Sequence, residues 1–218
     1  MRGMTEDRVG RAGCRIGAAV LLAILLPAAV TAQQPPRTAA AVFAGGCFWG
    51  VEWVFEHVRG VQSVVAGYSG GTVASPTYEQ VSTRRTGHAE SVKVTYDPGV
   101  VSYRQLLEVF FRVAHDPTTR DRQGQDAGSG YRAIVFVADS TQQREVAAYL
   151  AELTAQKVFA RPIVTEIRVL QPFYLAEAYH QRYAEQNQDA MYIAINDAPK
   201  IRRLKATYPA LYLEKTSP

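Results

Sequence analysis

The sequence predicts an α+β domain in which a mixed, ferredoxin-like sheet and a layer of helices form a two-layer sandwich, followed by an irregular C-terminal tail. Two observations lead to this expectation. Residues 39–170 alternate between strand and helix patterns, twice in the order strand–helix–strand. The 218 residues are 47% hydrophobic and 20% charged, the composition of an ordinary globular protein with one sizeable core.

The first strand–helix–strand unit begins at residues 39–44, a short apolar run that ends in two glycines. Residues 47–58 carry apolar side chains three and four positions apart, which predicts a helix, and Gly60 fits its end. The β-branched run at 61–68 and the alternating run at 91–96 predict two further strands.

A helix follows the strand at 91–96, and its start is marked by a capping box, Ser102 with Gln105 three residues later. This helix stops before Pro117 and leads into a polar loop without periodicity. The elements expected after that loop are a strand at 133–138, a helix that Asp139 and Ser140 cap and that reaches about 157, a strand at 163–170 and a helix at 177–188. Beyond residue 188 we expect a largely irregular chain.

The N-terminus has the order of regions that is typical of a secretory signal peptide. Basic residues up to Arg15 precede an apolar run at 16–30, and small residues surround Ala32. The run is shorter than the roughly 20 residues of a membrane-spanning helix. We therefore expect a signal peptide at 1–32, a linker at 33–38 and one domain at 39–218, with export to the periplasm or the medium. The alternative is an uncleaved segment that anchors the protein in the membrane.

The charge balance indicates neither nucleic acid nor a membrane surface as a partner. The formal net charge is +4, and the first 32 residues contribute +2 of it, which leaves +2 for the rest. The rest contains no block of Lys and Arg, so no basic binding face is expected. We expect a monomer.

The cysteine count makes Cys47 the candidate of greatest interest. The chain has two cysteines, and Cys14 leaves with the leader if cleavage follows Ala32. A lone cysteine forms no internal disulfide, so Cys47 is either an inert buried residue or a reactive one. It stands where two glycines end a predicted strand and a helix begins, and the N-terminus of a helix favours the thiolate.

Two large aromatic residues, Phe48 and Trp49, follow the cysteine directly. Consecutive helical positions point about 100° apart, so both do not face the core in the same way. We expect at least one to border the thiol and offer an apolar pocket for a group such as a methyl. For Phe48, the alternative to bordering the site is packing in the core. For Trp49, we favour a position that borders the site.

Five short blocks follow one another along the chain. They are Gly45-Gly46-Cys47-Phe48-Trp49-Gly50, Ser75-Pro76-Thr77-Tyr78, Thr86-Gly87-His88-Ala89-Glu90, Gly124-Gln125-Asp126 with Tyr131-Arg132, and Ala176-Glu177-Ala178-Tyr179-His180-Gln181. The first block resembles the signature of A-type methionine sulfoxide reductases, and the other four resemble further blocks of that family in the same order. The resemblance covers residues 39–215.

The resemblance implies a role for each matching residue. Cys47 attacks the sulfoxide sulfur and becomes a sulfenic acid. Glu90 is the acid that protonates the leaving oxygen, for which it must be partly buried and neutral. Tyr78 and Tyr131 bind the oxygen, and Asp126 orients and polarises the site. The resemblance also implies the S epimer of methionine sulfoxide, free or in oxidised proteins, as substrate, and no metal or organic cofactor.

The chain departs from the family in two places. Residues 127–130 (Ala-Gly-Ser-Gly) are smaller and more flexible than the usual block, and residues 188–218 contain no cysteine. Many members use C-terminal cysteines to resolve the sulfenic acid as a disulfide. Here we expect an external thiol to reduce it, from a thioredoxin-like protein, a glutaredoxin-like protein or a small thiol.

Two other functions are open on the residues alone. One is a cysteine hydrolase that pairs Cys47 with His88 or His180, and the other is a secreted binding module in which Cys47 is merely buried. The histidines lack metal-ligand spacing on a single helix. We expect His57 and His115 to be structural or surface residues, and His88 to support the turn before Glu90.

Overall fold

The computed structural model describes residues 38–215. The predicted signal peptide, residues 1–32, lies outside the described residues, as does the predicted linker apart from Thr38. Within residues 38–215, every helix is too short or too polar to cross a membrane.

Strands and helices follow one another along the described chain as the expected patterns indicate. The strands are β1 (Ala39–Gly45), β2 (Val61–Ser69), β3 (Ala89–Tyr96), β4 (Arg122–Gln123), β5 (Asp126–Ala127), β6 (Ala133–Val137), β7 (Glu166–Val169) and β8 (Tyr174–Leu175). The α-helices are α1 (Phe48–Glu56), α2 (Tyr78–Ser82), α3 (Tyr103–Val109), α4 (Ser140–Ala155), α5 (Tyr183–Gln186), α6 (Met191–Asn196) and α7 (Ala198–Thr207). A π-helical turn, η1 (Phe110–Ala114), continues α3, and η2 (Ser129–Tyr131) and η3 (Ala178–His180) are 3₁₀ turns.

The main sheet has the strand order β7-β6-β1-β3-β2-β8. Its central strands β6, β1, β3 and β2 pair antiparallel, and only the β6–β7 pair is parallel. α1 connects β1 to β2, and α3 connects β3 to β6. This is the ferredoxin-like arrangement with mixed strand directions, so the predicted fold class is confirmed.

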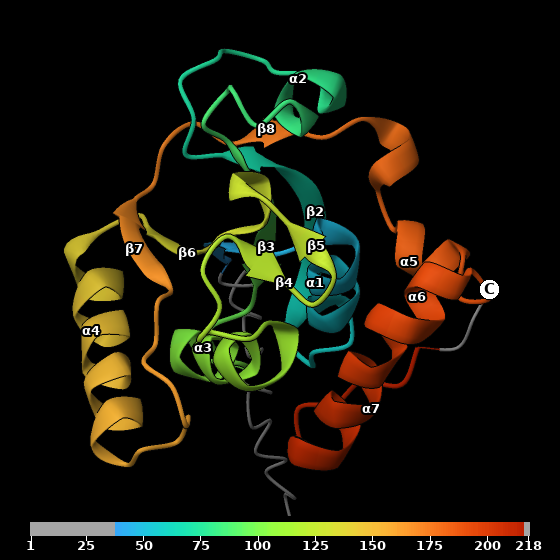
Figure 1. Ribbon diagram of the computed structural model, residues 1–218. Coiled ribbons are helices and arrows are strands. Elements are labelled where there is room, and N and C mark those ends of the chain that lie inside the picture. Colours follow the sequence, from blue (N-terminus) through green and yellow to red (C-terminus); the bar gives the residue numbers. More distant parts are fainter. Residues whose placement is uncertain (1–37, 216–218) are drawn as a thin grey trace, which may run out of the picture. The chain divides into compact units, whose positions relative to one another are not determined.

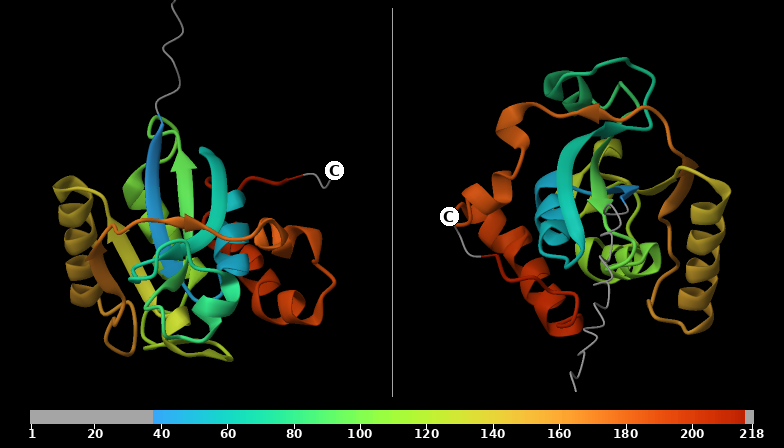
Figure 2. Two further views of the ribbon diagram at one scale, coloured as in Figure 1. Left: turned by 90° about the horizontal axis from the view of Figure 1, so that it is seen from above. Right: turned by 180° about the vertical axis from the view of Figure 1, so that it is seen from behind.

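The two connecting helices lie on the same face of the sheet, where the main core forms (Figure 2). Phe43 of β1 stacks on Phe55 of α1 and on Phe110 of η1, with ring centroids 5.1 and 4.7 Å apart. All three side chains are fully buried, and each burial stabilises the fold by about 2–3 kcal/mol. On the other face, the chain between β7 and β8 crosses the sheet and packs Leu170 and Phe173 against a smaller core.

The helix that carries the cysteine block and the capping box before α3 are confirmed. Ser102 accepts from the backbone of Gln105, whose side chain accepts from the backbone of Ser102. The expected strand at 163–170 is shorter and consists of β7. The loop after Pro117, for which we expected no regular structure, contains the small β4–β5 hairpin.

The expected irregular C-terminal tail is wrong. The region forms α6 and α7, which lie beside α1 in Figure 1. Ile193 of α6 and Leu204 of α7 are fully buried in apolar clusters that include residues of α1. This packing against α1 stabilises the two helices, although the local sequence does not predict them. The helix predicted at 177–188 is also wrong as one element, since Arg182 takes a left-handed backbone with φ of 54° and separates η3 from α5.

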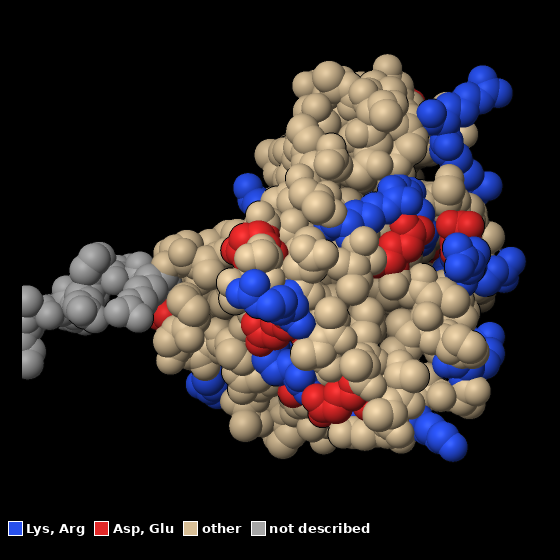
Figure 3. Space-filling model, turned by 90° about the vertical axis from the view of Figure 1, so that its left-hand side faces the viewer, with Lys and Arg blue, Asp and Glu red and all other residues tan. Residues whose placement is uncertain are grey.

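The surface that faces the viewer in Figure 3 carries basic and acidic side chains close to one another. Ion pairs also connect different elements of the described chain, such as Arg104 of α3 with Glu152 of α4 at 2.6 Å. This face is therefore not a continuous basic surface of the kind that binds nucleic acid.

Candidate active site

Cys47 stands at the junction between the central strand β1 and the helix α1. It is the N-cap residue of α1, and its side chain is partly buried. Gly46 turns the chain with a φ of 93°, and a Cβ there would lie 2.6 Å from the Cβ of Gln123 in β4. Only glycine fits this turn, which brings the thiol to the start of the helix beneath the β4–β5 hairpin.

Glu90 belongs to β3, and its side chain lies against the first turn of α1. Its side chain is only 6% exposed, and its Oε2 accepts a hydrogen bond from the backbone N–H of Phe48 at 3.1 Å. Burial, with a further contribution from the charge of Asp126, raises the pKa of Glu90 to about 8. The carboxyl is therefore mostly protonated at neutral pH, as an acid at this position requires.

The thiol itself is held in its neutral form. Burial raises the pKa of Cys47 well above its ordinary value, and the negative charges that Glu90 and Asp197 carry when ionised act in the same direction. The Trp49 backbone N–H and the Tyr192 hydroxyl favour the thiolate but do not outweigh burial. The position at the helix start thus exists as expected, but it does not by itself produce a resting thiolate.

Two phenols share the electrostatic environment of Glu90 and Cys47. Tyr78 opens α2, where its backbone N–H donates to Oε1 of Glu177 at 2.8 Å. Tyr131 ends η2. Burial and then the charge of Glu90 raise the pKa of both hydroxyls, so both stay O–H donors at neutral pH.

The loop that carries Tyr131 is held in place despite its small residues. Arg132 donates to the carbonyls of Ser129 at 2.6 Å and Gly87 at 2.7 Å. A longer bond, at 3.3 Å, reaches the carbonyl of His88. Arg132 therefore ties the Tyr131 loop directly to the segment that leads into Glu90.

Phe48 and Trp49 occupy different environments. Phe48 is 1% exposed and belongs to the main core, which favours its core-packing alternative. Trp49 is partly exposed and stacks on Tyr183, with ring centroids 4.0 Å apart. Its indole N–H donates to Nδ1 of His180 at 3.1 Å. Trp49 is thus a fixed aromatic side chain that borders the site.

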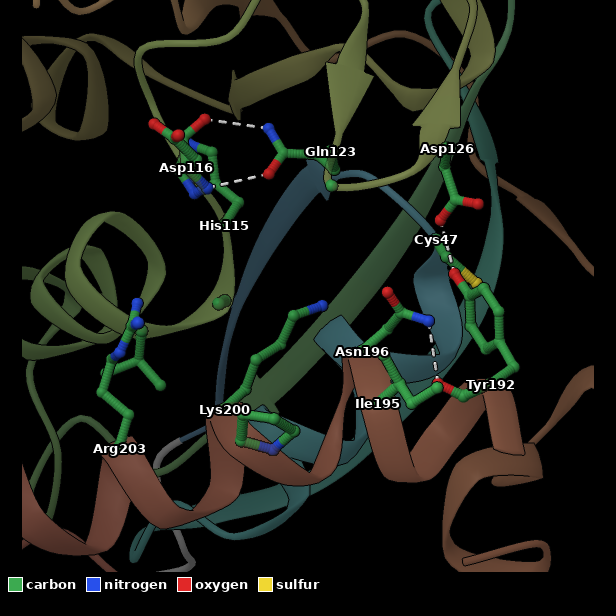
Figure 4. A pocket seen from close by; sticks show the side chains of 14 residues that line it. Cys47, His115, Asp116, Gln123, Asp126, Tyr192, Ile195, Asn196, Lys200 and Arg203 are labelled. Atoms are coloured by element: carbon green, nitrogen blue, oxygen red, sulfur yellow. Dashed lines mark hydrogen bonds between the residues drawn. The ribbon is translucent and has the colours of Figure 1, made fainter. Parts of the chain in front are cut away.

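Asp126 of β5 faces the cysteine together with a residue that the sequence did not single out, Tyr192 of α6. The Tyr192 hydroxyl donates to Oδ2 of Asp126. Figure 4 shows the Cys47 sulfur beside the Tyr192 ring, with Asp126 on the far side of the hydroxyl. The C-terminal helices therefore complete the wall of the site.

Asp197 was missed for the same reason as Tyr192, because both lie in the region expected to be irregular. Asp197 is fully buried, and its Oδ1 pairs with Nζ of Lys200 at 3.0 Å. One local signal was present: Pro199 follows Asp197 by two residues, and proline is frequent in the first turn of a helix.

The histidines are engaged elsewhere. His88 accepts from the Gly71 backbone N–H at Nδ1, and its Nε2 contacts the Val73 carbonyl, so it supports the segment before Glu90. His57 and His115 are buried and bond to backbone carbonyls, so they are structural. No histidine is bonded to Cys47 among the described residues, and no group of metal-binding side chains occurs in that part of the chain. The geometry therefore does not support the hydrolase.

Taken together, a thiol at a helix start, a mostly protonated carboxylic acid and two phenols at the edge of a ferredoxin-like sheet have the composition of a thiol-dependent active site. The model of the family described as "Peptide methionine sulfoxide reductase" matches residues 39–211. The chain is 49% identical to peptide methionine sulfoxide reductase MsrA 2 of Mesorhizobium japonicum, over 84% of this chain and 94% of that protein.

Solved structures agree with the sequence relatives. Reduced Mxr1 from Saccharomyces cerevisiae is 30% identical with a TM-score of 0.67, over 83% of this chain and 94% of that one. Methionine sulfoxide reductase A of Corynebacterium diphtheriae is 34% identical with a TM-score of 0.62, over 71% of this chain and 77% of that one.

The chain belongs to the peptide methionine sulfoxide reductase family. It is an oxidoreductase that reduces methionine sulfoxide to methionine through a cysteine sulfenic acid, a reaction that repairs oxidised protein.

Proposed function

We propose that Cys47 is the nucleophile of this reduction and Glu90 its acid. The sulfur of Cys47 attacks the sulfoxide sulfur and forms an S–S bond while Glu90 protonates the sulfoxide oxygen, and the proton of the thiol restores Glu90. A second proton from Glu90 releases this oxygen as water. A water molecule then attacks the Cys47 sulfur, the S–S bond breaks to release the sulfide, and the proton of the water returns to Glu90. The overall step converts Cys47–SH and the sulfoxide into Cys47–SOH and the sulfide, so two electrons pass from the thiol to the substrate. The observation that carries the assignment is the buried Glu90 carboxyl, bonded to the N–H of Phe48 and so placed beside Cys47.

Tyr78 and Tyr131 hydrogen-bond the sulfoxide oxygen in this proposal, because both hydroxyls keep their protons in the field of Glu90. Asp126 orients the site through its hydrogen bond from Tyr192. Of the two aromatic residues that the sequence assigns to substrate binding, Phe48 and Trp49, Trp49 supplies the accessible ring for the substrate methyl group, and the buried Phe48 ring lies behind it with ring centroids 6.4 Å apart.

The separation of an oxygen site from a methyl site makes the pocket chiral. A sulfoxide that places its oxygen on the phenols and its methyl group on Trp49 presents its sulfur to Cys47 in one configuration only. We assign the S epimer as substrate, both as the free amino acid and within oxidised proteins.

Recycling requires an external thiol, because the chain beyond the leader contains no cysteine other than Cys47. The reductant is a thioredoxin-like protein, a glutaredoxin-like protein or a small thiol. Neither a metal nor an organic cofactor has a part in the proposed steps.

The experiment is a single turnover with each epimer of an N-acetylated methionine sulfoxide methyl ester, followed by mass spectrometry of the trapped sulfenic acid. We expect one equivalent of sulfide and a modified Cys47 with the S epimer. Cys47→Ser yields neither product, and the exposed variant Glu79→Gln is the control. Turnover of the R epimer alone, or an intramolecular disulfide after turnover, would contradict the proposal.

We also propose that residues 1–32 direct export to the periplasm or the medium, and that the mature protein acts as a monomer. The order of basic, apolar and small residues supports the first statement. N-terminal sequencing of the protein from the periplasmic fraction is expected to begin at Gln33. A full-length chain in the membrane fraction would instead indicate an anchor, and light scattering tests the monomer.

A further inference from the structure

A groove that Tyr78 and Tyr131 do not line leads away from Cys47. It encloses about 250 Å³. Cys47, Asp126 and Tyr192 line one end and Asp116, Lys200 and Arg203 the other. Tyr78, Tyr131 and Glu90 are not among the lining residues. The groove thus reaches the sulfur by a second path, distinct from the proposed oxygen site.

Two of the four charged residues that line this groove are paired with an opposite charge, whereas the Asp126 carboxylate accepts only the hydrogen bond of the Tyr192 hydroxyl within residues 38–215. Asp116 pairs with Arg161 at 3.2 Å, and Lys200 pairs with Asp197 at 3.0 Å. Within residues 38–215, Arg203 makes no hydrogen bond and no ion pair, and its side chain is exposed. Figure 4 shows Arg203 and Lys200 rising from α7 toward the opposite wall of the groove.

We infer that this groove binds the reducing substrate, and that this substrate is a small thiol bearing a carboxylate. The inference rests on the proposed function of Cys47. A volume of about 250 Å³ suits a small molecule rather than a folded domain. Arg203 supplies a planar set of N–H donors that match a carboxylate, and Lys200 keeps two of its three N–H donors beyond the one given to Asp197.

The second path also fits the chemistry of reduction. In the proposed function the sulfoxide oxygen reaches Cys47 at Tyr78 and Tyr131, neither of which lines the groove, so a thiol in the groove approaches the sulfur by another route. The first thiol forms Cys47–S–S–R and releases the oxygen as water. A second thiol then attacks the sulfur of R, releases R–S–S–R and restores Cys47–SH, so two thiols supply the two electrons.

The test compares two thiols that differ by one charge, N-acetylcysteine and N-acetylcysteine amide. The sulfenic acid is formed with one equivalent of substrate, and its reduction is followed in stopped flow. Arg203→Gln is expected to lower the rate with the carboxylate by about two- to fivefold relative to the amide, as for an exposed ion pair. Arg203→Glu lowers the rate with the carboxylate further. Added salt reduces the difference in rate between the two thiols, because it screens the charge of Arg203.

The matched control is Arg202→Gln, because Arg202 is the neighbouring exposed arginine on α7 and does not line the groove. An equal loss with both thiols, or an equal effect in the control, would overturn the inference. An Arg203→Gln variant that raises the KM for the sulfoxide instead would assign the groove to the oxidised substrate. If the wild type forms no sulfenic acid, the proposed function of Cys47 is contradicted. The test thus distinguishes a failure of the proposed function from a failure of the inference about the groove.

Discussion

Replacement of Glu90 by Gln tests whether the buried carboxyl is neutral in the folded protein. The amide has nearly the shape of a protonated carboxyl, and its oxygen can accept the hydrogen bond that Phe48 N–H now donates at 3.1 Å. The amide cannot ionise. If Glu90 is neutral, Glu90→Gln therefore stabilises the protein at neutral pH while it removes the proton donor of the reaction.

The magnitude follows from the pKa of Glu90, raised from 4.5 to about 8. A pKa raised in the folded state gives a contribution to stability that is fully present below pH 4.5 and is lost as the pH rises to about 8. The loss amounts to about 1.4 kcal/mol per pH unit across that window. The variant should thus gain less than about 1 kcal/mol at pH 5 and up to about 3 kcal/mol at pH 7 over wild type.

Urea denaturation of wild type and variant at several pH values between 5 and 8 measures the difference. Glu79→Gln, at an exposed position on α2, is the control and should show no growing difference. Activity supplies a second measurement, since the rate of sulfenic acid formation in wild type should fall about tenfold per unit above pH 8 as Glu90 ionises. A stability difference that does not change with pH would refute the neutral carboxyl and its role as acid.

Other substitutions probe the remaining walls of the site. Cys47→Ser should abolish sulfoxide reduction without a change in melting temperature, measured by calorimetry. Tyr192→Phe leaves the Asp126 carboxylate without its donor beside the thiol, so sulfenic acid formation should slow by about tenfold in single turnover. Gly50→Ala places a Cβ against the buried Asp197 carboxylate, and urea denaturation should show a loss of about 2–3 kcal/mol; an unchanged midpoint would contradict this packing.

The elements that could be predicted are those whose signal is local. The helix after Cys47 and the capping box at Ser102 follow from side-chain spacing within a few residues. The family blocks pointed to Cys47, Glu90, Tyr78 and Tyr131, and the fold brings the side chains of these distant segments into one electrostatic environment.

The elements that could not be predicted depend on contacts between distant segments. The helices α6 and α7 are short, and their apolar residues are too few for a clear period, so packing against α1 decides their structure. Tyr192 and Asp197 are brought to the thiol by that packing alone. The same holds for Glu177, whose carboxylate joins the Tyr78 backbone to the Tyr68 hydroxyl across the sheet edge.

The neutral resting state of Cys47 changes how its reactivity is understood. Burial and nearby carboxylates oppose the thiolate, although the thiol sits at the start of a helix. A thiol is a poor nucleophile toward general oxidants, which protects a lone cysteine from wasteful oxidation. A sulfoxide differs from those oxidants because its oxygen accepts the proton of Glu90 as the sulfur is attacked, and the carboxylate left behind can then take the proton of the thiol. Reactivity thus arises from the pair of neutral groups and depends on a substrate that connects them.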